Sequence, residues 1–331
     1  MVKTDINRNQ IKKILIIQFR PFGDVLLTTS VFSVLKEAFT EAELHFLVNA
    51  PYHSILEHNR YLDKVIVKTS GIRFTTILKE IRTQQYDLVL DYINSNQSAL
   101  VTLFSGARYK CGYRKDKLRD KCYNILGFHP TKRYSAWMKF DLLKPLGVEK
   151  ERYELSVIIP QRDSDFAKKF INSNGGLRVK HIIISPNSPR PHKRWRPSYF
   201  AKVAEELARH DQVRVYLLEG PGEKEYVDLV ESFMNVSVKR ITGLTIMQLI
   251  AVLKEADLYI GNCGGPKHMA VAVNTPTITI FGPTDPVVWH PNNLPQHVAL
   301  INQEKRFIDD TFGINPVDVL QMAYQLLNIK S

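Results

Sequence analysis

Short apolar runs alternate along this chain with segments in which apolar residues recur every three or four positions. The run "KKILIIQF", residues 12–19, is typical of a buried strand, and the apolar positions of the following "GDVLLTTSVFSVLKEAF" have helical spacing. Further strands are predicted at 44–48, 64–67 and 87–91, with helical patterns between them. Apolar strands separated by helices indicate a parallel α/β sheet.

The same alternation begins again near residue 181. The predicted elements are strands at "HIIIS", "VRVYLL", "DLYIG" and "TPTITIF", and helices at 198–209, 223–234, 245–255 and after Gly265. A polar stretch, 160–180, interrupts the pattern once and is interpreted as a connector. We therefore predict two doubly wound α/β domains, 1–165 and 178–331. A last helix opens at Pro316, and we expect it to pack back on the first domain.

Length and composition are those of a two-domain globular protein. The 331 residues, 44% of them hydrophobic, are enough to bury a large core. The N-terminal "MVKTDINRNQ" is polar and lacks the apolar segment of a signal peptide, and no apolar run approaches the roughly 20 residues that span a bilayer. The cysteines, Cys111, Cys122 and Cys263, form no CxxC pair. We expect a cytosolic protein without structural zinc.

Positive charge is concentrated in one segment. The formal net charge is +12, and residues 108–139 contain ten Lys and Arg against two Asp. Such a segment attracts polyanions: nucleic acid, an anionic membrane face, or a phosphorylated or carboxylated glycolipid. The structural alternative is a solvated basic loop that only aids solubility. No recognition motif for nucleic acid accompanies the charge, which makes a nucleic-acid-binding protein the weakest of these hypotheses.

Two predicted strand-to-helix loops carry candidate chemistry. In "QFRPFGDVLLTTS", Gly23 permits a tight turn and Asp24 stands where the helix begins, although Asp is also a good helix cap. In "SPNSPRPHKRWRPSYF", Ser188 and Lys193 precede a helix start and suit a diphosphate, the alternative being a basic surface turn anchored by Trp195. Neither the G-x-G-x-x-G of dinucleotide folds nor a P-loop occurs in the sequence.

A third loop, "GNCGGPKH", combines glycines with a helix start. Gly264 and Gly265 would let an anion approach bare backbone N–H groups, which predicts a phosphate-binding turn. His268 would lie in the first helical turn, its alternative being a packed or capping histidine, and Cys263 is expected to be a small buried residue rather than a reactive thiol. The acidic "DSD", 163–165, mimics a metal-binding pair but is expected to be a solvated helix cap.

Taken in order, these motifs resemble glycosyltransferase family 9, the bacterial lipopolysaccharide heptosyltransferases. "KILIIQFRPFGDVLLTTSVFSVLKEAF" is similar to the N-terminal strand, loop and helix of that family, and "YDLVLD" with "SGARYKCGY", "KRW", "LLEGPGEKE" and "FGPTDP" are similar to its later landmarks. The resemblance covers nearly the whole chain. It implies the GT-B fold, with two Rossmann-like domains facing a central cleft, the acceptor bound by the first domain and the nucleotide sugar by the second.

The resemblance also implies an activity and its setting. The expected reaction is an inverting, metal-independent transfer of heptose or a related sugar from a nucleotide-diphosphate donor, ADP-heptose, to a lipopolysaccharide core or related glycolipid. No cofactor is expected beyond this donor, which is a substrate. The expected partners are the nucleotide sugar, an anionic glycolipid and the cytoplasmic face of the inner membrane, without nucleic acid. The protein would then be cytoplasmic and peripheral to that membrane.

Site residues carry over by motif. Asp24 matches the general base of the family, Ser188 and Lys193 match its diphosphate loop, and Glu219 falls near its nucleoside pocket. The expected donor-binding residues are Ser188, Lys193, Glu219, Cys263, Gly264, Gly265 and His268. The expected acceptor-binding residues are Arg20, Arg114 and Lys115.

Two departures from the family pattern set up an alternative hypothesis. Cys263 and Gly264 stand where the family turn, Asn-Asp-Ser-Gly-Pro-x-His, has Asp and Ser, and "DYINSNQSA" stands where the family usually has a Gln-Gly dipeptide. The missing acid is the one that approaches the donor near its ribose and sugar. The alternative is therefore a catalytically impaired homologue that binds nucleotide or glycan.

Overall fold

A computed structural model describes residues 6–71, 73–127, 131–150, 152–304 and 309–329. The chain divides into two compact units, residues 1–158 and 159–331. The division falls earlier than residue 165, where we expect the first domain to end, because the helix that crosses this position packs within the second unit.

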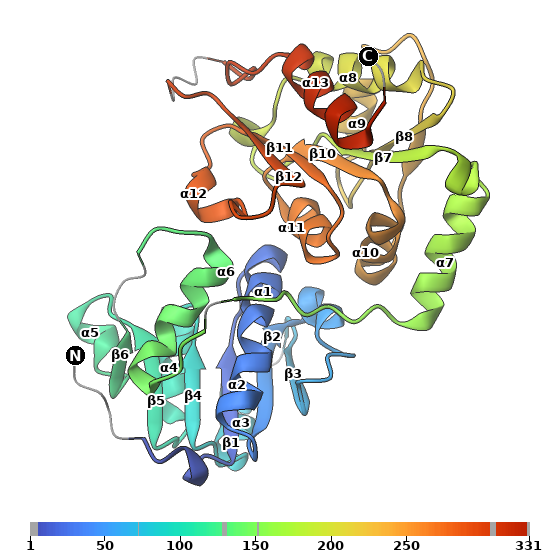
Figure 1. The fold of residues 1–331 in the computed structure, drawn as a ribbon. Coiled ribbons are helices and arrows are strands. Elements are labelled where there is room, and N and C mark those ends of the chain that lie inside the picture. Colours follow the sequence, from blue (N-terminus) through green and yellow to red (C-terminus); the bar gives the residue numbers. More distant parts are fainter. Residues whose placement is uncertain (1–5, 72, 128–130, 151, 305–308, 330–331) are drawn as a thin grey trace. The chain divides into compact units, whose positions relative to one another are not determined.

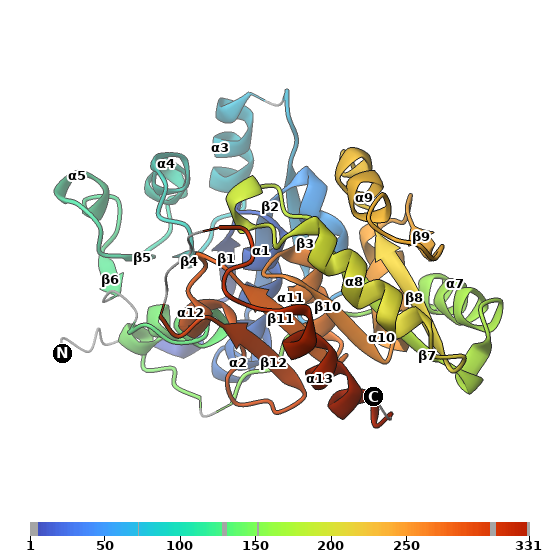
Figure 2. The ribbon, with the colours of Figure 1, turned by 90° about the horizontal axis from the view of Figure 1, so that it is seen from above.

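The first unit is built on a parallel sheet of six strands within the described ranges, in the order β3-β2-β1-β4-β5-β6. The strands are β1 Lys13–Ile17, β2 Glu43–Asn49, β3 Lys64–Lys68, β4 Leu88–Asp91, β5 Tyr109–Tyr113 and β6 Ile125–Gly127. The helices are α1 Phe22–Thr28, α2 Phe32–Ala38, α3 Phe74–Thr83, α4 Asn96–Phe104, α5 Lys117–Asp120 and α6 Ser135–Met138, the last followed by the 3-10 turn η4 Lys139–Leu142. Figure 2 shows α3, α4 and α5 on one face of this sheet and α2 on the other.

The basic segment 108–139 is more ordered than a solvated loop. It contributes β5, α5, β6 and α6, so its cations alternate with side chains that are buried against the sheet, such as Cys111 and Ile125. Burial of the apolar positions fixes the basic residues in place at one end of the sheet. The segment is therefore not one continuous loop, although six of its ten cations lie in the connections between these elements; residues 128–130 lie outside the described residues.

The second unit repeats the architecture. Where the structure describes it, the sheet runs β12-β11-β10-β7-β8-β9, and all pairings are parallel. The strands are β7 Lys180–Ser185, β8 Val213–Leu218, β9 Lys239–Ile241, β10 Leu258–Asn262, β11 Thr277–Phe281 and β12 His297–Ile301. The helices are α7 Gln161–Asn172, α8 Pro197–Ala208, α9 Lys224–Glu231, α10 Ile246–Glu255, α11 Gly265–Ala272, α12 Pro286–Trp289 and α13 Pro316–Leu327. The doubly wound fold predicted for both halves is confirmed (Figure 1).

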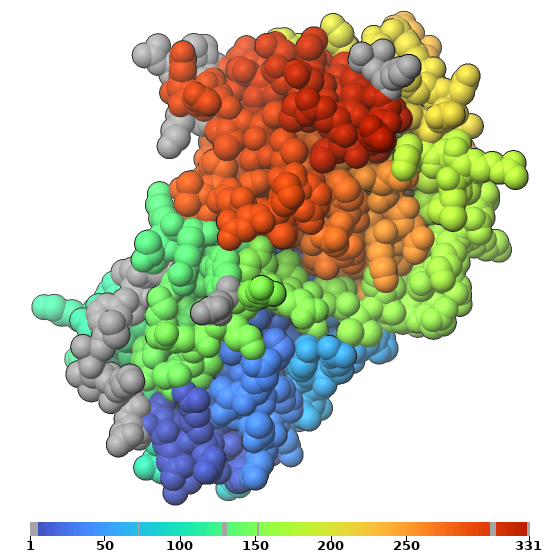
Figure 3. Space-filling view, in the orientation of Figure 1, coloured from blue at the N-terminus to red at the C-terminus, as the bar shows by residue number. Residues whose placement is uncertain are grey.

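Two helices complete the hydrophobic packing of this unit. The stretch interpreted as a connector contains α7, which packs on α10 through Ala167 and Ile171. The last helix, α13, buries Val319 and Ala323 in the same hydrophobic core as α8. Its other side forms part of the surface of that unit (Figure 3).

Parallel pairing brings all the strand ends of one unit to the same edge of its sheet. In the second unit, Gly261 of β10 is level with Ser185 of β7, so the loops that follow these strands start side by side. In the first, Ile17 of β1 is level with Asp91 of β4. Ligands of doubly wound sheets bind at this edge. No helix in the described part of the chain has both the length and the apolarity needed to cross a bilayer.

Candidate active site

Asp24 lies in the first turn of α1, just beyond the end of β1. Its carboxylate Oδ1 is 3.3 Å from the ammonium Nζ of Lys139 in η4, and the two side chains are only 14% and 8% exposed. The N-cap position of α1 belongs to Pro21, and no side chain caps the helix. Asp24 is therefore one half of a sheltered ion pair and does not have the capping role that was its alternative.

Lys139 is the first site residue that the sequence did not indicate. It belongs to the segment expected to present surface charge, but it is buried, and its ammonium lies 5.9 Å from the centre of the Tyr92 ring. Burial lowers the pKa of Lys139 below its usual range, while the nearby Asp24 carboxylate acts in the opposite direction. The pair holds the Asp24 carboxylate in a fixed position at the carboxyl edge of the first sheet.

The predicted acceptor-binding cations lie at the same edge. Arg20 is exposed and follows β1, and its backbone N–H donates to the side chain of Gln18 at 3.1 Å. Arg114 and Lys115 follow β5, and the Lys115 ammonium donates to the Asn94 carbonyl at 3.2 Å. Because β4 lies between β1 and β5, the structure places these residues on one edge but in two separate loops.

In the second unit, the glycine turn lies between β10 and α11, as its motif predicts. Gly264 is the N-cap and Gly265 the first residue of α11. A Cβ atom built on Gly265 would meet no protein atom within 4 Å, so the space beside this backbone is open. The packing of the protein would therefore tolerate a side chain at this position. A ligand that approaches the backbone N–H donors at the helix start would need this space to stay empty.

Behind this turn lies a buried lysine. The Lys267 ammonium, with no measurable exposure, donates to the Trp289 carbonyl and lies 3.2 Å from Nδ1 of His268. Burial lowers the pKa of Lys267 to about 8. Burial, and then the charge of Lys267, hold the pKa of His268 well below its usual range. The His268 ring is thus neutral, and with Nδ1 facing an ammonium its proton lies on Nε2.

The loop after β7 brings a second cation toward the same place. Lys193 ends the 3-10 turn η7 Pro191–Lys193, and its pKa is lowered first by burial and then by Arg190, while Cys263 acts in the opposite direction. The pKa of the Cys263 thiol is raised by burial, against the opposing charges of Lys267 and Lys193. Cys263 therefore lies within electrostatic reach of two lysines. Ser188, also buried, accepts a hydrogen bond from Arg194 Nε at its carbonyl, at 2.7 Å.

One asparagine joins the two loops. The side chain of Asn262, the last residue of β10, accepts from the backbone N–H of Trp195 at 3.0 Å and donates to the carbonyl of Pro186 at 2.6 Å. Trp195 itself is fully buried, and its indole donates to carbonyls next to α13. The turn that carries Lys193 is therefore anchored by Trp195, while residues 189–192 of the turn are exposed, so both the diphosphate loop and the anchored surface turn remain compatible with this geometry.

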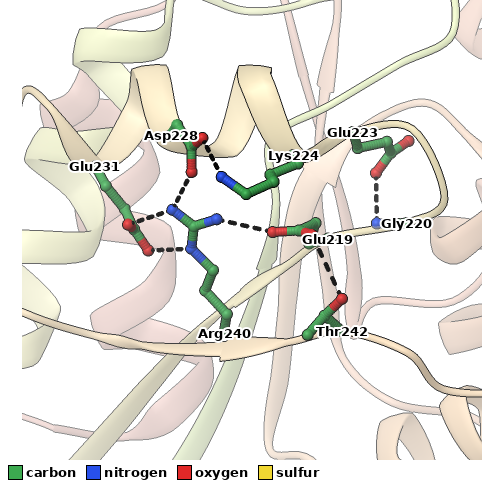
Figure 4. Close-up of polar contacts among 8 residues, drawn as sticks. All are labelled: Glu219, Gly220, Glu223, Lys224, Asp228, Glu231, Arg240 and Thr242. Carbon is green, nitrogen blue, oxygen red and sulfur yellow. Dashed lines mark hydrogen bonds and ion pairs between the residues drawn. The ribbon is translucent and has the colours of Figure 1, made fainter.

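Glu219, expected near a nucleoside, lies at the end of β8 in a network of ions (Figure 4). Its carboxylate is 2.8 Å from the Arg240 guanidinium, which also contacts Asp228 and Glu231. The Thr242 hydroxyl lies 3.4 Å from the other oxygen of Glu219. The structure thus places Glu219 at the correct edge of the sheet but gives it a cationic partner of its own.

The acidic triplet 163–165 does not form the solvated cap that we expect. Asp163 lies in the first turn of α7 with its side chain buried, and Pro160 occupies the N-cap position. Asp165 accepts a hydrogen bond from Gln161 at 2.8 Å. Across the ranges that the structure describes, no group of three or more His, Cys, Asp and Glu side chains is arranged to hold a metal ion.

The family model of glycosyltransferase family 9 (heptosyltransferase) matches residues 74–309. The chain belongs to glycosyltransferase family 9. Among curated relatives of the family, it is 29% identical to lipopolysaccharide heptosyltransferase 3 of Escherichia coli K12 over 82% of this chain and 83% of that protein. It is 33% identical to lipooligosaccharide heptosyltransferase 2 of Campylobacter jejuni over 79% of this chain and 78% of that one. The family assignment based on motifs is confirmed, and this family 9 protein is a glycosyltransferase.

Solved structures agree on the fold of this glycosyltransferase. The family 9 glycosyl transferase of Veillonella parvula has a TM-score of 0.85 at 22% identity, covering 97% of this chain and 98% of that one. E. coli heptosyltransferase WaaC with ADP-2-deoxy-2-fluoro heptose has a TM-score of 0.74 at 16% identity, covering 95% of this chain and 99% of that one. The expected GT-B fold of two Rossmann-like units is confirmed.

Three residues next to the predicted site residues were missed: Lys139 in the first unit, and Asn262 and Lys267 in the second. A lysine is usually exposed, so composition and charge place it on the surface by default. Asn262 does carry a sequence signal, since a polar residue that ends an apolar strand run often bonds to the next loop. The partners of Lys139 and Asn262 are 115 and 67 or more residues away, which no local pattern reveals.

Proposed function

We propose that this glycosyltransferase moves heptose, or a closely related sugar, from ADP-heptose to a lipopolysaccharide core acceptor, with inversion at the sugar carbon and without a metal ion. The curated relatives are named as heptosyltransferases of lipopolysaccharide and lipooligosaccharide. The structural neighbour WaaC of E. coli was solved with ADP-2-deoxy-2-fluoro heptose. The observation in this chain that carries the proposal is the group of two lysines, Lys193 and Lys267, around the open glycine turn.

These lysines suit the leaving group of the reaction. When the bond between the sugar carbon and the diphosphate breaks, its electron pair leaves with ADP, and negative charge grows on the phosphate oxygens. The N–H groups at the start of α11 and the Lys193 ammonium would stabilise that charge directly, and Lys267 would add positive potential from behind the turn. Side chains and a helix end would thus perform the task that a divalent cation performs in other transferases.

Asp24 would act as the base. Its carboxylate takes the proton of the acceptor hydroxyl while the hydroxyl oxygen bonds to the sugar carbon on the side opposite ADP, which inverts the configuration. The ion pair with Lys139 keeps the carboxylate from rotating away from its position. A single base is sufficient, because inversion needs no covalent sugar–enzyme intermediate.

The acceptor would be anionic and attached to a lipid. Arg20, Arg114 and Lys115 lie at the carboxyl edge of the first sheet and would bind its phosphate or carboxylate groups. Such an acceptor is presented at the cytoplasmic face of the inner membrane, and we propose a cytoplasmic protein that binds there peripherally.

The test is turnover by the purified protein. With ADP-heptose and a delipidated core oligosaccharide, we expect release of ADP and a glycosidic bond of configuration opposite to that of the donor, measured by NMR coupling constants. Chelator should leave the rate unchanged. The same assay with UDP- and GDP-sugars tests the donor, and a product of retained configuration would refute the proposed mechanism.

The second candidate is a homologue that binds nucleotide or glycan without turnover, and Cys263 favours it, because the acid of the family turn is missing. A ligand present at 100 times its Kd raises stability by about 2.7 kcal/mol, so thermal denaturation with ADP, UDP and GDP detects binding independently of catalysis. Stabilisation by ADP with no turnover on any acceptor would favour this candidate.

A further inference from the structure

Helix α4 of the first unit exposes its large apolar side chains and buries small and polar ones. Its buried side consists of Ser98, Ala99, Val101 and Thr102, whereas Leu100, Leu103 and Phe104 are 40%, 40% and 53% exposed. Surface helices of soluble domains ordinarily bury their large apolar residues and expose the small polar ones. The exposed residues are spaced i, i+3 and i+4, so they form one stripe on the helix.

The hydroxyl groups on the buried side of α4 form hydrogen bonds within the helix itself. Ser95 and Ser98 form a capping box at the helix start, and the Thr102 hydroxyl donates to the Ser98 carbonyl at 2.9 Å. Ser105, one residue beyond the helix, donates to the Thr102 carbonyl at 2.7 Å. These bonds lie within the helix and would turn with it. The apolar stripe is held outward because Val101, on the buried side of α4, packs in the hydrophobic core with Val89 and Ile93.

Cations lie near both ends of α4. The loop before α5 and α5 itself are tied to the residues ahead of α4, because Lys115 and Arg119 both donate to the Asn94 carbonyl at 3.2 Å. At the other end of α4, the Arg82 guanidinium of α3 lies against Gly106. Figure 2 shows α4 between α3 and α5. Residues 105–121 contain seven Lys and Arg against two Asp.

Helix α5 adds a further exposed apolar side chain. Leu118 is 78% exposed and stands between the cations Lys117 and Arg119, with Lys121 following. Lys117 and Lys121 are exposed, whereas Arg119 is paired with Asp116. We call the combination of Leu100, Leu103, Phe104 and Leu118 with Lys117 and Lys121 the α4–α5 surface.

We propose that the α4–α5 surface docks this protein on the anionic face of a phospholipid bilayer. Apolar side chains in a field of lysine and arginine match the boundary between acyl chains and negatively charged headgroups. A second copy of the chain is a poorer partner, because a symmetric interface would bring the same cations against one another. The docking is independent of the transferase assignment, but its purpose, access to a lipid-anchored acceptor, rests on the proposed function.

Vesicle binding by the full-length protein tests the proposal. We expect sedimentation with vesicles of phosphatidylcholine and phosphatidylglycerol, but not with phosphatidylcholine alone, and weaker binding at about 0.5 M than at about 0.05 M NaCl. Leu103→Ser with Phe104→Ser should weaken binding about 10-fold or more through lost apolar contact. Lys117→Gln with Lys121→Gln should weaken it by roughly 10- to 30-fold and reduce its salt dependence.

Matched controls come from the second unit. Val317 on α13 is 64% exposed, and Lys202 on α8 is exposed, so Val317→Ser and Lys202→Gln remove the same kinds of group elsewhere and should bind vesicles as the wild type does. Circular dichroism and melting curves check that each variant is folded. Undiminished binding by both double variants would overturn the proposal. So would wild-type self-association, measured by sedimentation velocity, that disappears in the Leu103→Ser, Phe104→Ser variant, since a second copy would then cover the stripe.

Activity separates this proposal from the proposed function. Turnover on a delipidated acceptor should be the same in the wild type and the Leu103→Ser, Phe104→Ser variant, whereas turnover on acceptor embedded in anionic vesicles should fall about 10-fold, as binding does. Vesicle binding without turnover on either acceptor would refute the proposed function and leave the docking surface in place. Turnover with equal rates on embedded acceptor would refute the docking surface alone.

Discussion

Replacing Lys267 with methionine should make the protein more stable and less able to bind its donor. The ammonium has no exposure and, among the described residues, forms no ion pair with a carboxylate. Its pKa falls from the usual 10.5 to about 8 on folding, because burial penalises the charged form. The unfolded chain therefore holds this proton more tightly than the folded protein does. Stability is reduced below pH 8 and is recovered as the pH rises from 8 toward 10.5.

The size of the effect follows from the shift in pKa. At about 1.4 kcal/mol per pKa unit, the charged lysine costs the folded state about 3 kcal/mol at pH 7 and about 1 kcal/mol at pH 9.5. Methionine removes this cost but leaves the Trp289 carbonyl and His268 Nδ1 without their donor, at about 1 kcal/mol each. The expected net gain at pH 7 is therefore about 1 kcal/mol, changing to a loss of about 1 kcal/mol at pH 9.5.

Urea unfolding followed by tryptophan fluorescence, at pH 7 and pH 9.5, measures both values. Because the variant is compared with the wild type at each pH, titrating groups that do not interact with Lys267 cancel. Lys202→Met, at an exposed position of α8, is the matched control and should show no such change with pH. ADP affinity of Lys267→Met should fall while its stability at pH 7 rises. A difference between variant and wild type that does not change with pH would refute the account of Lys267 as an uncompensated buried cation.

Three further substitutions test the other site residues. Lys193→Ala should weaken ADP binding by roughly 1.5 to 3 kcal/mol, as measured by calorimetry, and unchanged affinity would remove Lys193 from the donor site. Asp24→Asn should lower turnover by about 10² to 10⁴ with ADP binding retained, and a folded variant with normal turnover would show that Asp24 is not the base. Cys263→Asp should supply a negative charge next to Lys267, which raises the urea midpoint at pH 7 and makes the midpoint change less between pH 7 and pH 9.5. An unaltered pH dependence of the midpoint would show that the two positions do not interact.

The parts of the fold that could be predicted are those in which a local pattern has a local cause. Central strands such as β1 and β10 are almost wholly buried, so their sequences are uninterrupted apolar runs. The short strands β5, β6 and β9 were missed, because "YKCGY" and "KRI" carry charged residues and "ILG" has only three positions. The order of strands within each sheet depends on contacts between distant segments and was not predicted.

The same distinction applies to the site. The sequence located Asp24, Lys193 and the glycine turn, since strand-to-helix loops and glycines are visible locally. It did not show that Lys139 pairs with Asp24 or that Lys267 is buried, because both properties depend on elements remote in sequence. Asp24 is not the helix cap because α1 begins at Phe22, two residues earlier than the motif suggests. The Asp24 carboxylate therefore lies inside the first turn.

The bridging side chain of Asn262 has a consequence for how donor preference can be redesigned. Because its amide bonds to both the Pro186 carbonyl and the Trp195 N–H, Asn262 fixes the two ends of the loop after β7, and it precedes positions 263 and 264 of the proposed donor turn. Residues 263 and 264 can therefore be substituted together without breaking the two hydrogen bonds of Asn262. A library confined to residues 263 and 264 would sample nucleotide-sugar selectivity, whereas one that includes residue 262 would mostly sample loss of the loop geometry.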